Sequence, residues 1–262
     1  MVLIDSHCHI DAAAFDPDRA AVLERAAGAG VAQIIAPAVS AASWPKLKSV
    51  AQTHACVIPA YGLHPMYLDA HRPEHLVDLR SWIEAERPCA IGECGLDHYV
   101  GGLDPDYQRE ILVGQLRLAR EFDLPVILHA RKALDELMGL LRRFDGLRGV
   151  VHSFSGSQQQ ADRLCDMGFF LGIGGPVTYE RARRLRRTVQ AIPIEHLLLE
   201  TDAPDQPDAG IRGQRNEPAR LLEILHVIAH LRDEGPAKIA AHTTANAQRL
   251  FQLPAAVPDA PH

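Results

Sequence analysis

The stretch that decides the fold runs from Val2 to His9 and reads VLIDSHCH. Its first three residues are apolar, as expected of a buried strand, and a turn that carries two histidines follows directly. A strand that binds a dinucleotide would instead lead into a glycine-rich G-x-G-x-x-G turn, and no such turn follows here. The stretch therefore argues against a dinucleotide-binding sheet and indicates a buried strand whose end carries imidazole groups.

Seven further short apolar runs follow this first one, and segments with helical periodicity separate them. The eight predicted strands cover residues 2–4, 33–36, 57–61, 89–92, 125–128, 149–151, 169–173 and 196–199. Buried strands that alternate with amphipathic helices predict a parallel sheet covered by helices, and eight such units close a TIM-type barrel. We therefore predict an α/β fold, a (β/α)8 barrel, over a doubly wound open sheet.

Length and composition fit one globular unit. The chain has 262 residues, of which 47% are hydrophobic and 23% charged, so a large core can form. We expect a single barrel over residues 1–252. The segment 253–262 is rich in proline and alanine and is expected to be an unstructured tail.

The net charge and the cysteine content bear on the class of substrate and on the cellular compartment. A net charge of -6 is not typical of a general polyanion binder, so a nucleic-acid substrate would need metal ions or a basic rim. The five cysteines form no C-x-x-C pair, which favours a reducing compartment. Neither a leader nor a membrane span is visible, so we expect a cytoplasmic location and no membrane partner. The oligomeric state stays open.

Candidate metal ligands fall at the predicted strand ends. Side chains alternate in extended chain, so His7 and His9 point to the same side. Four further ligand types end later strands; they are Glu93, His129, His152 and Asp202. Barrel enzymes assemble their chemistry at this carboxyl-terminal face, and imidazole and carboxylate ligands suit Zn, Mn or Mg.

The ligand types predict two divalent ions. A carboxylate has two oxygens and can bridge two cations, whereas a neutral imidazole offers one lone pair. We expect Glu93 to be the bridge. His7, His9 and Asp202 would then share one ion with Glu93, and His129 and His152 would share the second. Two ions roughly 3.5 to 4 Å apart can clamp both oxygens of an in-line displacement.

With these residues placed, the chain resembles the TatD family of metal-dependent deoxyribonucleases, within the amidohydrolase-like barrels. Its motifs are DSHCH at 5–9, GLHP at 62–65, GECGLD at 92–97, LHAR at 128–131, HSFSG at 152–156 and ETDAP at 200–204. The resemblance implies a (β/α)8 fold, divalent metal dependence and hydrolysis of phosphodiester bonds, with DNA as the usual assigned substrate. It also implies a role beside the scissile phosphate for His64.

Other residues are candidates for supporting roles. Arg131 has the same parity as His129 and could bind a phosphate through its planar guanidinium, so we expect it, with His64, to contact substrate. Asp5 and Glu200 should enter the barrel interior, either orienting a ligand or satisfied by nearby backbone and hydroxyl groups. Arginines also gather at 181–187 and at 212 and 215, of which the latter two are expected to lie nearer the site. Aromatic residues are only 5%, which argues against a base-stacking platform.

The favoured function is a phosphodiesterase or nuclease acting on DNA ends, with metal-bound hydroxide as nucleophile. Glu93 and Asp202 would be the catalytic carboxylates, Asp202 also accepting a proton. Engagement of DNA is expected to be weak and transient. Two alternatives remain open: a small-molecule amidase, lactonase or phosphatase on the same barrel, and a non-catalytic metal-binding scaffold.

Overall fold

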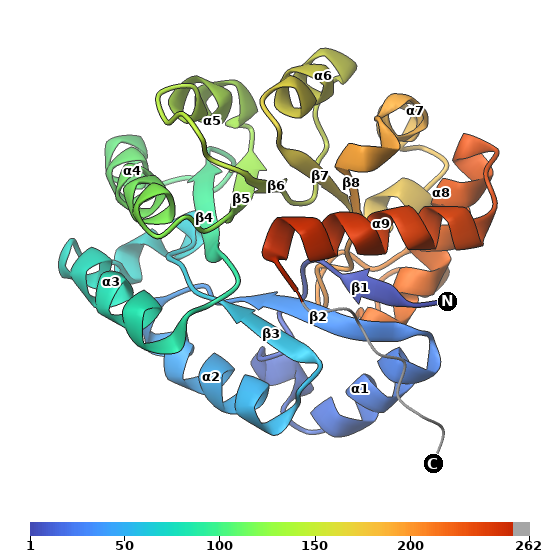
Figure 1. Ribbon diagram of the computed structural model, residues 1–262, viewed down its shortest axis with the longest axis horizontal. Helices are drawn as coiled ribbons and strands as arrows, with labels where there is room; N and C mark the ends of the chain where they lie inside the picture. Colours follow the sequence, from blue (N-terminus) through green and yellow to red (C-terminus); the bar gives the residue numbers. More distant parts are fainter. Residues whose placement is uncertain (254–262) are drawn as a thin grey trace.

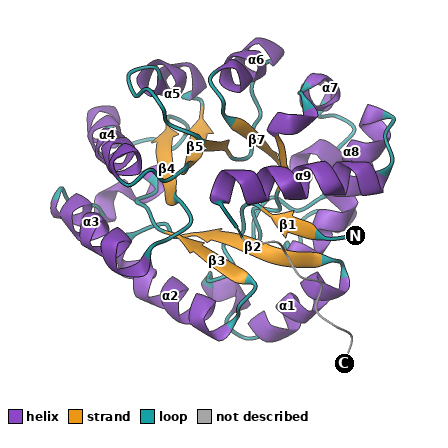
Figure 2. Cartoon of the chain, in the orientation of Figure 1, coloured by secondary structure: helices purple, strands orange, loops and turns teal. Residues whose placement is uncertain are grey.

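Parallel strands follow one another around a barrel, each followed by a helical segment on the outside (Figures 1 and 2). The computed structural model describes residues 1–253, so all but the first residue of the predicted tail 253–262 lies outside the described residues. The strands are β1 Leu3–Asp5, β2 Val31–Pro37, β3 Val57–Ala60, β4 Ile91–Asp97, β5 Val126–Arg131, β6 Gly149–Val151, β7 Phe170–Ile173 and β8 Leu197–Leu199. The helices are α1 Arg19–Gly28, α2 Trp44–Thr53, α3 Glu74–Glu86, α4 Pro105–Glu121, α5 Leu134–Leu141, α6 Gln158–Asp166, α7 Arg183–Ala191, α8 Leu221–Arg232 and α9 Pro236–Phe251. This architecture confirms the predicted α/β barrel.

Backbone contacts join two sheet segments into the barrel. The first has the order β1-β2-β3 and the second β4-β5-β6-β7-β8, with parallel pairing throughout. Tyr61 forms a parallel bridge with Ile91 and connects β3 to β4. On the other side, the Ser6 amide donates to the carbonyl oxygen of Leu199 at 3.0 Å. These contacts bring the carboxyl ends of all strands to one face.

The bounds of β4 and β5 differ from the predicted ones. Both strands extend beyond the predicted 89–92 and 125–128, so the expectation that Glu93 and His129 end their strands is wrong. The ladder continues because Gly95 pairs with His129 and Asp97 with Arg131. Gly95 has a φ of +150°, and a Cβ atom there would lie 2.0 Å from the carbonyl oxygen of His129. Only glycine permits this close approach of the two strands.

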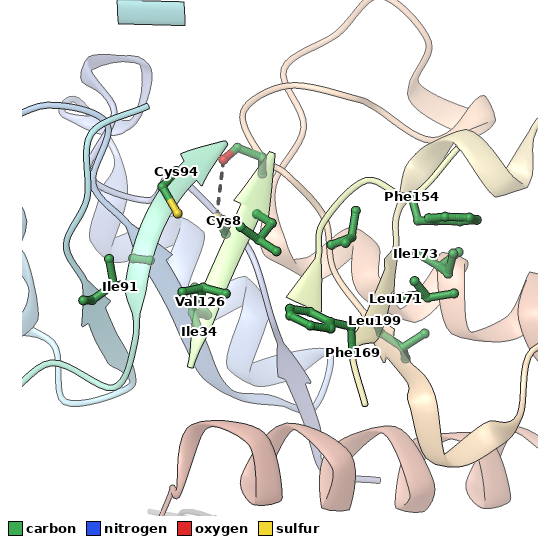
Figure 3. Close-up of a cluster of buried hydrophobic side chains, with 14 of the residues drawn as sticks. Cys8, Ile34, Ile91, Cys94, Val126, Phe154, Phe169, Leu171, Ile173 and Leu199 are labelled. Atoms are coloured by element: carbon green, nitrogen blue, oxygen red, sulfur yellow. Dashed lines mark hydrogen bonds between the residues drawn. The ribbon is translucent and has the colours of Figure 1, made fainter. Parts of the chain in front are cut away.

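The core alternates along each strand. Ile34, Val126, Leu171 and Leu199 belong to the layer between strands and helices, part of which Figure 3 shows. Their chain neighbours point the other way and fill the barrel interior; this interior layer contains Ile4, Ile35, Ala60, Ala90, Ile127, Val150, Phe170 and Leu198. Side chains of a strand alternate between its faces, so both layers follow from apolar runs without polar interruption.

Helix α9 closes the end of the barrel opposite the ligand residues and lies across the strands in Figure 1. Its Ala247, Leu250 and Phe251 pack against the interior layer and are at most 3% exposed. Within residues 1–253, no helix is long and apolar enough to cross a membrane.

Two glutamines of α4 hold the chain where it leaves β3 and β4. The Gln115 side chain accepts from the amide of Leu63 at 2.8 Å and donates to the carbonyl oxygen of the same residue at 3.1 Å. Gln108 does the same to Asp97, at 2.8 and 2.9 Å. Seven residues make about two helical turns, so the glutamines lie on one face of α4. The side-chain amide of each glutamine therefore makes the two backbone hydrogen bonds that an adjacent strand would otherwise make.

Candidate metal centre

The six predicted ligands meet at the carboxyl-terminal face of the barrel, around a cavity of about 870 Å³. His7 and His9 follow β1, Glu93 and His129 lie within β4 and β5, and His152 and Asp202 follow β6 and β8; they come from different strands but point into one space. All except His9 and His129 are at least nine-tenths buried. The six side chains that were selected because they follow predicted strands therefore lie close together in the folded chain.

The Glu93 carboxylate divides the site into two halves. Its Oε2 atom lies 3.2 Å from Nε2 of His7 and 3.4 Å from Nε2 of His9. Its Oε1 atom lies 2.8 Å from Nε2 of His152 and 3.1 Å from Nδ1 of His129. Each carboxylate oxygen thus faces a different pair of imidazole rings.

Asp202 completes the first half of the site. Its Oδ1 atom lies 3.5 Å from Nε2 of both His7 and His9. The other oxygen, Oδ2, accepts a hydrogen bond from the side-chain amide of Gln206. Asp202 has a φ of +55°, a left-handed conformation that Asp tolerates better than most residues. One carboxylate oxygen therefore stays directed at the two histidines.

Hydrogen bonds select the ring nitrogen that His9 and His129 present to the centre. Nδ1 of His9 lies 3.2 Å from the carbonyl oxygen of Pro37, which can only accept, so in the neutral ring Nδ1 carries the proton and Nε2 has the lone pair. Nε2 of His129 lies 2.9 Å from Oδ2 of Asp97, so in its neutral ring the Nδ1 lone pair is directed at the centre. Both rings are thus oriented as metal ligands.

His64 presents the opposite arrangement. Its Nδ1 accepts a hydrogen bond from the amide of Met66 at 3.1 Å, so in the neutral ring Nε2 carries the proton. That Nε2 lies 2.9 Å from Oε1 of Glu93. An imidazole that donates through Nε2 suits contact with an anionic oxygen better than ligation of a cation. His64 also forms a possible ligand group with Glu93 and His129, so its role beside substrate stays a prediction.

Charges within the site compensate one another. Burial raises the pKa of Glu93, but His152, His64 and His7 outweigh it and hold this pKa well below its usual range. Burial lowers the pKa of His7 well below its usual value, so its imidazole is neutral. Burial opposes protonation of His152, but Glu93 and Glu200 raise its pKa well above the usual value. The ionised carboxylate and neutral His7 fit cation binding, and a cation would replace the proton on His152.

Asp97 is a supporting residue that the sequence argument did not single out. Its Oδ2 atom holds His129, while Oδ1 accepts from the amides of Tyr99 at 2.8 Å and Val100 at 2.9 Å. Burial raises the pKa of Asp97, but these hydrogen bonds outweigh burial and lower the pKa to about 2. Asp97 has the same parity as Glu93 in β4, and that parity could have identified it.

The two open interpretations for Asp5 and Glu200 separate in the structure. Asp5 accepts hydrogen bonds from the amides of His7 and Thr201 and from the Thr201 hydroxyl, so it is satisfied by backbone and hydroxyl groups. Glu200 accepts from the amide of Ser153, and its Oε1 lies 3.7 Å from Nδ1 of His152. Only Glu200 therefore has the place of a residue that orients a ligand.

Of the arginines considered in the sequence, Arg131 lines the cavity and Arg215 does not. Arg131 ends β5, is exposed and lines the cavity. Arg215 instead donates to both carboxylate oxygens of Asp18 at 2.7 Å, near the start of α1. The guanidinium of Arg215 is therefore engaged by an acidic partner far away in the sequence, and Arg215 does not line the cavity.

Comparisons with known proteins agree with this geometry. Residues 4–252 match the family described as TatD related DNase. The chain is 43% identical over 257 residues to an uncharacterized metal-dependent hydrolase, YjjV, of Escherichia coli, covering 96% of this chain and 98% of that protein. It is 37% identical to a 3'-5' ssDNA/RNA exonuclease TatD of Cronobacter sakazakii, covering 95% and 97%.

A solved structure supports the same assignment. The crystal structure of YjjV, a TatD homologue from Escherichia coli, superimposes with a TM-score of 0.92 at 40% identity and covers 96% of this chain and 98% of that one. A TatD family hydrolase from Entamoeba histolytica has a TM-score of 0.85 at 21% identity, which bears on the fold alone. The chain therefore belongs to the TatD family and is a metal-dependent hydrolase.

Proposed function

We propose that this hydrolase is a phosphodiesterase acting on DNA ends and that it holds two divalent ions, Mg, Mn or Zn. The observation that carries the proposal is the Glu93 carboxylate, whose two oxygens face two separate imidazole groups. His7, His9 and Asp202 would hold one ion with Oε2 of Glu93. His129 and His152 would hold the other with Oε1.

The fit of a cation pair follows from the donors themselves. Oε2 of Glu93 is buried and has no hydrogen-bond partner among residues 1–253, which is costly for a carboxylate unless a cation compensates it. Oxygen and nitrogen donors without thiolates suit the hydrolytic divalent metals. Such ions, when bound, polarise a phosphoryl oxygen and lower the pKa of a coordinated water.

The protein's own side chains would position the substrate and move the proton. His64 would donate through Nε2 to a phosphate oxygen, and Arg131 would hold the same or the adjacent phosphate through its guanidinium. Asp202 is the best placed proton acceptor, because its Oδ1 faces the centre beside His7 and His9. A carboxylate in this place can act as a general base.

The name of the Cronobacter sakazakii relative supports a nucleic-acid substrate. A panel of substrates tests the proposal. Labelled single-stranded DNA and bis(p-nitrophenyl) phosphate would be compared with esters, lactones and cyclic amides under Mg, Mn and Zn. We expect phosphodiester turnover that EDTA removes and added metal restores. Turnover confined to esters or amides would replace the proposal with a small-molecule hydrolase, and the absence of any turnover would favour a metal-binding scaffold.

A further inference from the structure

A second cavity, of about 650 Å³, adjoins the metal centre. Ala130, Arg131 and Ser155 line both cavities, so the two spaces share a wall at the end of β5. From there the second cavity extends past the loop that follows β4 toward Arg184 in α7. It therefore continues the metal centre outward in one direction.

The cations that line this cavity are available to an anion. Arg131, Lys132 and Arg184 form no ion pair with any carboxylate of residues 1–253. Arg184 donates to the carbonyl oxygen of Ser155 at 2.7 Å, which uses one of its five N–H groups and fixes the side chain beside the cavity.

The acidic residues of the same wall are already engaged. Glu136 lies 2.8 Å from Nε2 of His98 and 2.6 Å from Nε of Arg109. Asp135 accepts a hydrogen bond from the side-chain amide of Gln160 at 2.9 Å. Arg109 thus compensates the charge of Glu136, whereas the neutral amide of Gln160 leaves the charge of Asp135 in place. The three cations without an ion pair therefore face one such carboxylate, and the local field of the second cavity favours an anion.

Tyr99 orders two of these cations. Its side chain is 54% exposed, and the Arg131 guanidinium carbon lies 3.6 Å from the ring centroid. Lys132 Nζ lies 4.7 Å from the same centroid, and the φ of Lys132 is +55°. A guanidinium held over a ring keeps the N–H groups at its edge free for a phosphate. The exposed side chains of Met66 and Tyr67 line the first cavity, so apolar contacts also flank the metal centre there.

We propose that the second cavity is a subsite for the nucleotide next to the scissile bond, in which Lys132 and Arg184 bind its phosphodiester. The proposal rests on the proposed phosphodiesterase function. It makes the preferred substrate a strand of several nucleotides, because a substrate with one phosphodiester fills the metal centre and leaves the subsite without a ligand. Tyr99 would contact the sugar or base of this nucleotide.

The test compares a substrate of one phosphodiester, the p-nitrophenyl ester of thymidine 5′-phosphate, with an oligothymidylate of about ten nucleotides. For the wild-type protein we expect kcat/KM to be higher on the oligomer. Lys132→Gln and Arg184→Gln should each lower the ratio of the two kcat/KM values by about tenfold, the worth of one charge-assisted contact. Arg187→Gln is the matched control, since Arg187 is an exposed arginine of the same helix that does not line the cavity.

Binding gives a second readout. The affinity for the labelled oligomer, followed by anisotropy in Ca²⁺, should depend less steeply on salt by about 0.7 in log–log slope for each variant. An unchanged ratio and slope, or an equal loss on both substrates, would overturn the subsite while leaving the phosphodiesterase intact. Failure of the wild-type protein to hydrolyse either substrate would overturn the proposed function together with the subsite.

Discussion

The two ends of the barrel interior are built from the same strands but have opposite chemistry. On β5, and across the ends of β6 and β8, an apolar residue is followed two positions later by a polar one that points the same way; the pairs are Ile127 and His129, Val150 and His152, and Leu198 and Glu200. The apolar members pack under α9, whereas the polar members surround the metal centre. One step along the same face of a strand thus changes the role of a side chain from packing to chemistry.

This difference shows how the fold separates stability from function. The apolar end gains free energy from buried surface and from α9. The polar end buries carboxylates and imidazoles whose atoms are partly unsatisfied, which disfavours folding unless a cation binds. Changes at the metal centre should therefore affect activity, and changes under α9 should affect the free energy of unfolding.

Glu93→Gln should show the largest effect. The amide keeps one carbonyl oxygen but loses the charge, and its NH₂ group cannot ligate a cation, so neither half of the site is held well. We expect phosphodiesterase activity to fall about a thousandfold or more, with a thermal midpoint close to that of the wild type. Rates at saturating Mn and melting of the same preparation measure both. A folded variant that keeps near-wild-type activity would disprove the bridging role.

Phe251→Ala should reverse this pattern. Phe251 is 3% exposed and packs against the apolar interior layer, so its truncation should destabilise the fold by about 3–5 kcal/mol. Denaturant unfolding measures the loss, and activity per folded molecule should be retained. His242→Ala, at an exposed position of α9, is the control and should change stability by about 0.5 kcal/mol at most. Equal effects of the two substitutions would contradict the role of α9 as the closing element.

The double variant His129→Ala, His152→Ala separates the two halves of the metal centre. Each imidazole would supply a donor to the second ion, so metal content should fall from about two ions per chain toward about one. Elemental analysis of protein prepared without chelator measures it. His226→Ala, on the exposed side of α8, should leave the content unchanged. Full occupancy in the double variant would refute the assignment of these ligands.

Arg131→Ala should have the smallest effect of the four. Guanidinium binds phosphate and does not ligate metals, so KM should rise by about tenfold at unchanged metal content. Steady-state kinetics and metal analysis of one preparation test this together. A loss of metal at unchanged KM would place Arg131 in the support of the centre and not in substrate binding.

Strand parity accounts for what the sequence could predict. Apolar runs located all eight strands, and the same parity placed His129 and His152 where the structure has them. The extent of β4 was not predictable in this way, because the ladder beyond Glu93 depends on the close approach of Gly95 to a different strand. The sequence therefore predicted which residues lie near the ends of the strands, but it did not predict the lengths of the strands.

Contacts between loops were the other gap. Gln206 donates to Asp202 of its own loop and accepts from the Ser153 hydroxyl of the loop that follows β6, and no local pattern marks this second contact. A run of arginines likewise does not show which member has an acidic partner, so Arg215 was favoured over Arg184. The low aromatic content also concealed Tyr99, an exposed ring that lines the second cavity. Such features depend on tertiary neighbours.

The paired glutamine contacts of α4 have a consequence for hydrogen exchange. The amides of Leu63 and Asp97 are bound by the buried side chains of Gln115 and Gln108, and not by an adjacent strand. Their protons can exchange only when α4 moves away from the sheet. Exchange at these two positions should therefore be as slow as in the barrel core and should report the opening of α4 as a unit. The segment that carries His64 and the end of β4 that carries Asp97 would then open no more often than α4 does.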